Sequence, residues 1–384
     1  MAQKNILNNE KRSRYFKYFV SILPGLLLTI AVTVAAYYLN VLIQFLIPTN
    51  QSPISNIFIA IILGLAIKNL ISLPKIFNPG ISFSIKKVLK LGIILMGIRL
   101  STLELVKIAG VAITVVLICI LLGLIFTIFI AKKFKLPAKL GTLIAVGTSI
   151  CGATAIVAAG PAIEAEDEEI AYAIGTITIF GIITMFSYPY LTHLLFGFND
   201  FQSGIFMGTA IHETAQVAGA GLMYDQLWIK DKLQSISGAD VAIITKLVRN
   251  IFMILVIPLM VYYHNKTQVM KERKNINFLN VFPLFIIGFI IMALLRSLGD
   301  QLIIVKGLFW NVNSWNKLWG SVQVWSGYFL SVAMAGVGLS TDVKKFKNIG
   351  VKPFLVGLLA ALFVGLMSFI LILVLKPFLS SISF

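Results

Sequence analysis

The stretch from Gly204 to Gly221 reads GIFMGTAIHETAQVAGAG and sets two adjacent ionisable residues, His212 and Glu213, inside an apolar run. An ionisable side chain at bilayer depth costs about 2.5–3.5 kcal/mol on insertion scales, so such residues are rare and face a cavity or a bundle interior. Small residues surround the pair, and Gln216 follows shortly after. This pattern predicts a polar site inside a membrane-embedded helix bundle and points to transport.

The composition supports the same class. The chain has 384 residues, of which 58% are hydrophobic and only 12% are charged, whereas soluble proteins carry about 25% charged residues. Its apolar runs last about 20 to 30 residues, long enough for helices to cross a hydrocarbon core, while barrel strands would alternate over about ten residues. We therefore predict an all-α polytopic membrane protein.

The apolar runs predict ten to eleven transmembrane helices. Residues 1–17 are expected to form a cytoplasmic tail and residues 18–380 a single transmembrane domain, with polar loops near 263–279 and 298–320. The expected spans are residues 17–47, 54–71, 84–100, 104–131, 138–160, 168–197, 202–223, 240–262, 280–297, 321–340 and 350–378.

The basic residues set the predicted topology. Most of the 32 Lys and Arg residues cluster in segments 4–17, 68–90, 132–139, 266–274 and 344–352, which fall on one side when the spans alternate. Because cytoplasmic loops are enriched in Lys and Arg, the net charge of +17 is an orientation signal and does not indicate nucleic-acid binding. We expect a bacterial plasma-membrane protein with a cytoplasmic N-terminus and an extracellular C-terminus.

Small and hydroxyl-bearing residues interrupt the predicted span 138–160, where Thr148, Ser149, Cys151 and Gly152 lie close together. Glycines weaken a helix at such a place. One interpretation is a small-residue packing face between helices. The other is a discontinuous helix, in which these four residues bind an anion through their hydroxyls and the backbone N–H groups at the start of a half-helix.

Two basic residues, Lys246 and Arg249, are three positions apart in the predicted span 240–262 and so share one helix face. Either their side chains extend to the membrane interface, or they line an anion pathway and offset the charge of the anion. An arginine suits the second role because its guanidinium can contact an oxyanion through two N–H groups.

The His212–Glu213 pair is either a buried structural pair or the site of coupling. Histidine titrates near pH 6.5, so His212 could carry a coupling proton, with Glu213 as its partner or as the alternative proton or cation site and Gln216 as a polar orienting group. A His-Glu-x-x-His zinc site fails because Gln216 stands at the second histidine position. Cys119 and Cys151, both in predicted helices, indicate neither a disulfide nor a zinc site, and we expect no metal or cofactor.

Two internal similarities suggest repeats. The segment 95–102 matches 334–341 in spans of opposite predicted direction, which is the trace that an inverted-topology repeat leaves. The segment 147–150 matches 208–211, but in spans of the same predicted direction. Both matches cannot belong to one simple inverted pair, so the assignment of repeats stays open.

These motifs carry a family resemblance over about residues 20 to 375. The chain resembles the sulfate exporter family of YeiH-type bacterial membrane proteins in GTSICGA at 147–153, HETAQVA at 212–218, KLVR at 246–249 and LGIILMG at 91–97. Thr214 departs from the valine frequent in that family. The resemblance extends to the superfamily of sodium/proton antiporters and bile-acid symporters. It implies a core and a panel domain, crossing broken helices, elevator-like alternating access and a homodimer.

The function we expect is secondary active transport of a small anion, with sulfate or a related sulfur oxyanion first, coupled to protons. A sodium/proton antiporter with Glu213 as cation ligand and a passive anion channel are the alternatives. The antiporter is weakened because the other candidate aspartates lie in loops or at helix ends: Asp225, Asp231, Asp240 and Asp342. An enzyme is not expected, since the sequence lacks a phosphate-binding loop and a metal triad.

Overall fold

Long apolar helices dominate the computed structural model of the protein, and six of them satisfy the length and composition of a membrane span. A seventh span forms if the bent pair Gly238–Ile251 and Met253–Tyr263, with an angle of 42° between its halves, crosses as one. The six are Tyr18–Leu46, Thr102–Lys133, Asp167–Phe196, Phe285–Ile303, Val312–Ser340 and Val351–Pro377. The prediction of an all-α polytopic membrane protein is confirmed.

The structure describes residues 2–46, 55–197, 199–228, 236–267, 284–305, 311–343 and 350–380. All regular structure within these residues is helical. Most of the predicted loop 263–279 and several of the basic segments used for the topology lie outside the described residues.

The other four predicted spans are shorter or interrupted helices. The span 54–71 corresponds to α2 (Asn56–Leu70), and the span 84–100 is a chain of short helical pieces. The spans 138–160 and 202–223 are each broken into two helices. Apolar length therefore located these segments correctly, but it did not reveal where the backbone leaves the helix.

The chain divides into two compact units, the first made of residues 1–92 and 324–343. Its boundaries fall inside α4 and α15, so both of these helices contribute residues to each unit. The helices of the first unit are α1 (Ala2–Leu46), α2, η1 (Lys75–Phe77), α3 (Asn78–Phe83), η2 (Ser84–Val88), the start of α4 (Leu89–Met96) and the second part of α15 (Val312–Ser340). The predicted tail 1–17 is, from Ala2 onward, the beginning of α1.

Helices of the first unit approach one another through glycines. A Cβ placed on Gly338 of α15 would lie 2.3 Å from the carbonyl oxygen of Ile61 in α2, and one on Gly64 of α2 would lie 2.7 Å from the carbonyl oxygen of Ala335. Small residues at such a contact let two backbones pack closely, which is how helices associate inside a membrane. This contact holds α2 against the end of α15.

We predict that Gly338→Ala lowers the thermal stability of the purified protein, because the new methyl group overlaps backbone atoms that cannot move without separating α2 from α15. Overpacking of this kind costs about 1–3 kcal/mol. Gly327→Ala is the matched control in the same helix, since its Cβ would meet no atom within 4 Å. Equal melting temperatures for the two variants would show that the close approach of Gly338 to α2 does not contribute to stability.

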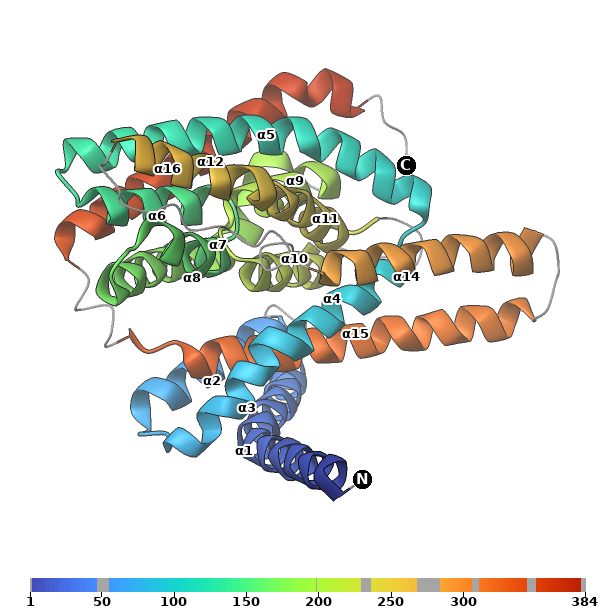
Figure 1. Ribbon diagram of the computed structural model, residues 1–384. Coiled ribbons are helices and arrows are strands. Elements are labelled where there is room, and N and C mark those ends of the chain that lie inside the picture. Colours follow the sequence, from blue (N-terminus) through green and yellow to red (C-terminus); the bar gives the residue numbers. More distant parts are fainter. Residues whose placement is uncertain are drawn as a thin grey trace. The chain divides into compact units, whose positions relative to one another are not determined.

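The second unit consists of residues 93–323 and 344–384. Its helices are the end of α4, η3 (Gly97–Arg99), α5 (Thr102–Lys133), α6 (Ala138–Ser149), α7 (Gly152–Ala159), η4 (Pro161–Ile163), α8 (Asp167–Phe196), α9 (Asp200–Ala210), α10 (Thr214–Trp228), α11 (Gly238–Ile251), α12 (Met253–Thr267), α14 (Phe285–Gly299), η5 (Asp300–Val305), the start of α15 and α16 (Val351–Ser380). Within this unit α11 packs against α5, α9 and α10 (Figure 1), and every residue from Gly238 to Asn250 is buried.

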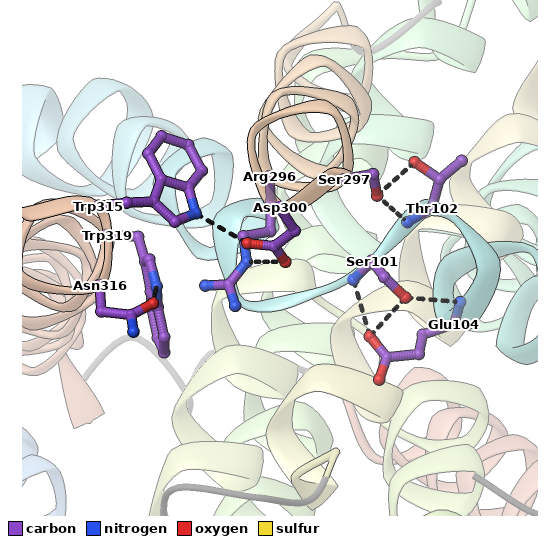
Figure 2. Close-up of polar contacts among 9 residues, drawn as sticks. All are labelled: Ser101, Thr102, Glu104, Arg296, Ser297, Asp300, Trp315, Asn316 and Trp319. Carbon is purple, nitrogen blue, oxygen red and sulfur yellow. Dashed lines mark hydrogen bonds and ion pairs between the residues drawn. The ribbon is translucent and has the colours of Figure 1, made fainter. Parts of the chain in front are cut away.

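The region 298–320, predicted to be a loop, is largely helical. The π-helical segment η5 continues α14, and α15 begins at Val312; residues 306–310 lie outside the described part. Asp300 accepts hydrogen bonds from Arg296 Nε at 2.6 Å and from Trp315 Nε1 at 2.7 Å, and the Arg296 guanidinium stacks 3.9 Å above the Trp319 ring (Figure 2). The polar residues of this region, which suggested a loop, instead connect α14 and η5 to the start of α15.

The same end of α14 also contacts the start of α5 (Figure 2). Ser101 and Glu104 form a reciprocal capping box, in which the Glu104 carboxylate accepts from the Ser101 N–H at 2.7 Å and Ser101 Oγ accepts from the Glu104 N–H at 3.2 Å. Ser297 Oγ accepts the Thr102 N–H at 2.7 Å. These bonds fix where the long helix α5 begins.

Candidate functional site

Two broken helix pairs meet at the candidate site. The pair α6 and α7 is interrupted at Ile150 and Cys151, and the pair α9 and α10 is interrupted between Ile211 and Glu213. Both interruptions fall inside predicted spans and at the motifs that the sequence singled out, so the predicted discontinuous helices are present. At bilayer depth such a break leaves backbone groups that must be satisfied within the protein.

Lys246 satisfies three of these groups. Its Nζ donates to the carbonyl oxygens of Ile150 and Ile211, each at 2.9 Å, and of His212 at 2.5 Å. The side chain is fully buried in α11. An ammonium group has three N–H donors, so all three are directed at carbonyl groups of the two breaks.

Arg249, one turn further along α11, donates hydrogen bonds to carbonyl groups at the ends of α6 and α9. Its Nε donates to the Ser149 carbonyl at 2.8 Å and its Nη2 to the Thr148 carbonyl. Its Nη1 donates to the Thr209 carbonyl and, at 3.3 Å, to that of Ile211. These carbonyls form the negative ends of two helix dipoles, and two buried cations offset them.

The structure bears on one of the two interpretations offered from the sequence. Lys246 and Arg249 do not extend to an interface, since they are 0% and 1% exposed. Their donors bond backbone carbonyls of the two breaks, and their role in an anion pathway stays a prediction.

Glu213 lies at the start of α7. Its Oε1 accepts the N–H of Ala153 at 3.3 Å, and a Cβ on Gly152 would lie 2.4 Å from Glu213 Cγ. Gly152 has a φ of +46°, a left-handed conformation that glycine adopts without strain. Glu213 is partly exposed, unlike His212, Lys246 and Arg249. The carboxylate thus occupies the half-helix N-terminus where the sequence predicted a bound anion.

Gln216 orients the start of α10. Its Oε1 accepts the N–H of Glu213 at 3.2 Å, and its Nε2 donates to the Thr178 carbonyl of α8 at 3.5 Å. Gly181 of α8 makes room for this amide, because a Cβ there would lie 2.0 Å from Gln216 Oε1. These bonds join α8 to the start of α10, and the role of Gln216 as an orienting group stays a prediction.

The remaining predicted ligands have mixed surroundings. The Thr148 hydroxyl donates to its own helix, at the carbonyls of Ile144 and Ala145, and is committed there. Ser149 Oγ is buried without a hydrogen-bond partner among the described residues. Cys151 Sγ lies 3.5 Å from the Thr214 hydroxyl.

The sequence analysis missed Asn250. Its Nδ2 donates to Thr214 Oγ1 at 3.1 Å, which links α11 to the start of α10. Asn250 is buried, and it follows Lys246 by four residues on the same helix face. The signal available in the sequence was a third polar residue on the face that already carries Lys246.

Unpaired polar atoms gather at these breaks and on α11. Six buried side-chain atoms in this region have no hydrogen-bond partner within the described chain: Ser149 Oγ, Thr209 Oγ1, His212 Nδ1, His212 Nε2, Thr245 Oγ1 and Asn250 Oδ1. A buried polar group left unpaired costs about 1–3 kcal/mol.

Two of the aspartates considered for an antiporter, Asp225 and Asp240, form a separate cluster. Asp240 caps the start of α11 with Ser237 and forms an ion pair with Arg99 at 3.4 Å, while Asp225, in the last turns of α10, accepts the Ala239 N–H at 3.0 Å. Asp342 follows the end of α15, and Asp231 lies outside the described residues. The three described aspartates of this set therefore lie at or next to helix ends, as predicted.

Comparison with known proteins gives the family. A family model described as conserved hypothetical protein 698 matches residues 24–357. UPF0324 membrane proteins of Streptococcus agalactiae serotype V and of Bacillus anthracis are each 30% identical to the chain, over 344 and 373 residues. The alignments cover 90% and 97% of this chain and 94% and 98% of those relatives. The chain belongs to the UPF0324 membrane protein family.

A third UPF0324 membrane protein, from Agrobacterium fabrum, is 30% identical over 358 residues, which are 93% of this chain and 94% of the relative. The names of these relatives describe membrane proteins and carry no sulfate or exporter designation. The family match includes both helix breaks and all of α11. The entire candidate site of this UPF0324 protein thus lies within the residues that the family model matches.

We predict that Gly181→Ala destabilises the protein through Gln216, because the added methyl group overlaps the amide that holds the Glu213 N–H. In a double-mutant cycle, Gln216→Ala should remove most of the cost of Gly181→Ala, with a coupling energy of about 1–3 kcal/mol. Thermal unfolding of the wild type, the two single variants and the double variant measures this coupling energy. Additive losses in the double variant would show that Gly181 acts elsewhere.

Proposed function

We propose that this UPF0324 protein is a secondary active transporter that carries a small oxyanion, sulfate or a related sulfur oxyanion first, at the meeting point of its two broken helix pairs. The observation that carries the proposal is a surplus of buried positive charge. Lys246 and Arg249 are fully buried cations, and Glu213 is the carboxylate bonded at the same breaks. Buried charge is costly unless it is compensated, and a bound anion would compensate the surplus.

The sign of the surplus favours an anion over a cation as the solute. With Glu213 ionised, two cations face one carboxylate; with Glu213 protonated, both positive charges are uncompensated. The carbonyls that accept from Lys246 and Arg249 are neutral groups, so they solvate the two positive charges but do not neutralise them as a bound anion would. A dianion would balance the protonated site, and sulfate has that charge.

In this proposal the cations attract the anion without touching it, since their donors hold backbone carbonyls. The direct contacts to the anion come from two of the predicted sites. These are the Ser149 hydroxyl, at the end of α6, and the Cys151–Gly152 turn at the start of α7. The unpaired Ser149 Oγ is available for such a contact. Thr148 makes no direct contact with the anion in this proposal, because its hydroxyl donates within α6 and its carbonyl accepts from Arg249.

Coupling to protons follows from competition at the start of α7. The Glu213 carboxylate accepts a backbone N–H there, so an incoming anion meets a like charge in its own binding position. Protonation of Glu213 removes that charge and weakens its bond to the N–H group. His212, whose two ring nitrogens are buried and unpaired, is the second proton carrier in the proposal.

Alternating access of the elevator type, which the sequence resemblance implies, is compatible with a chain that divides into two compact units. A sodium/proton antiporter would use the Glu213 carboxylate to bind a cation instead of an anion. A passive channel would conduct the anion without coupling it to protons. Both are outcomes of the experiment that follows.

The test is counterflow of radiolabelled sulfate in proteoliposomes, with and without an imposed pH gradient. Saturable uptake that responds to the gradient is expected from the wild type. Glu213→Gln, which mimics the protonated carboxyl, should keep counterflow, lose its pH dependence and bind sulfate about tenfold more tightly at neutral pH, the effect of about 1.4 kcal/mol. Full coupled transport by both Glu213→Gln and His212→Ala would show the coupling assignment to be wrong.

Glu104→Gln is the control for the loss of a carboxylate, because the Glu104 carboxylate bonds Ser101 in the cap of α5 and lies outside the two helix breaks. A sodium-driven pH change without sulfate uptake would favour the antiporter. Sulfate conductance that ignores the pH gradient in wild type and variants alike would favour the channel. Folded protein without any sulfate signal would reject sulfate as the solute.

A further inference from the structure

The Lys246 ammonium lies inside a cage of main-chain oxygens. The carbonyls of Ile150 and Ile211 approach Nζ at 2.9 Å and that of His212 at 2.5 Å. One oxygen comes from the α6–α7 break and two from the α9–α10 break, so the ammonium joins backbone segments about sixty residues apart. All three carbonyl groups therefore converge on one side-chain nitrogen.

Carbonyl groups at helix breaks are the usual ligands of free monovalent cations in membrane proteins. Unwound backbone and half-helix C-termini coordinate Na⁺ in secondary transporters, and carbonyl oxygens replace the hydration shell of K⁺ in channels. The oxygens around Lys246 Nζ have the same origin, and the ammonium is a compact point charge similar to such an ion.

We propose that the Lys246 ammonium stands in a monovalent-cation site, so that the protein carries a tethered cation where other broken-helix transporters bind a free one. The cage then needs neither Na⁺ nor K⁺ in the wild type. When the lysine side chain is removed, the carbonyls lose their partner and become a binding site for a small free cation. The assignment rests on the cage alone.

Arg249 shows why the assignment is specific to Lys246. The guanidinium spreads its donors over the carbonyls of four residues, which are bonded by three nitrogens of one planar group. A single ion could not replace that fork. The lysine nitrogen, by contrast, is one atom surrounded by three oxygens.

One consequence concerns coupling and rests on the proposed function. A cation fixed to the chain cannot be exchanged between the two sides of the membrane, so this position cannot couple transport to a sodium gradient. Movement of the anion would then depend on the protonation of Glu213 and His212. The stability test below does not use transport, so failure of one proposal is distinguishable from failure of the other.

The experiment measures the melting temperature of purified protein in NaCl, KCl, methylammonium chloride and choline chloride at equal ionic strength. The wild type should melt at the same temperature in all four salts. Lys246→Ala should melt at least about 5 °C lower in choline chloride and recover with increasing Na⁺, K⁺ or methylammonium, saturating as binding to the folded state requires. Choline is too large to enter a cage that one nitrogen fills.

Lys139→Ala is the matched control, because Lys139 Nζ also donates to a backbone carbonyl, that of Glu164 at 2.7 Å, but at an exposed position. It should show no cation-specific recovery. The proposal is overturned if Lys246→Ala melts at one temperature in all four salts. It is equally overturned if the wild type itself gains stability from Na⁺ or K⁺ with saturation, and this second measurement decides the matter even if Lys246→Ala does not fold.

Discussion

The bonds from two buried cations of α11 to the carbonyl ends of α6 and α9 are the interaction on which the second unit depends. A helix that ends inside a membrane leaves carbonyl groups that lipid cannot satisfy. Lys246 and Arg249 supply the donors for six residues of the two breaks. Without these two side chains the irregular backbone would carry unpaired carbonyl groups. The bonds that join the α6–α7 break to the α9–α10 break would also be lost.

This arrangement also determines the electrostatics. An ammonium at Lys246 and a guanidinium at Arg249 supply donors for all of these carbonyls, which in our proposal places positive charge deep in the unit, and Glu213 offsets only part of it. The carboxylate is held at the start of α7 by the Ala153 N–H and is given its position by the tight turn at Gly152. Structure and proposed function therefore share one cause, because the groups that stabilise the break are the groups that would attract an anion.

Supporting contacts keep this geometry in place. Gln216 holds the N–H of Glu213 and reaches α8 beside Gly181, and Asn250 reaches Thr214 from α11. The Thr214 hydroxyl accepts from the Asn250 amide and lies 3.5 Å from Cys151 Sγ. It thus forms a polar link between the two breaks.

The sequence by itself determined the class of the protein and the positions of the apolar segments, and it singled out most of the polar residues that lie at the two breaks. Apolar length and charge distribution are properties of the chain, and a polar residue in such a segment is conspicuous wherever it packs. Thr148, Ser149, Cys151, Gly152, His212, Glu213, Gln216, Lys246 and Arg249 all lie at or beside the two breaks.

Only the tertiary structure decided which atoms these residues bond. The sequence could not show that Lys246 and Arg249 face backbone carbonyls, since those carbonyls belong to segments far away in the chain and are exposed only because the helices break. It could not show that Glu213 occupies the start of α7, or that Asn250 belongs to the site. The region 298–320 was mistaken for a loop because its polar residues bond one another across α14 and α15. Partners of this kind are chosen by packing, which local sequence does not encode.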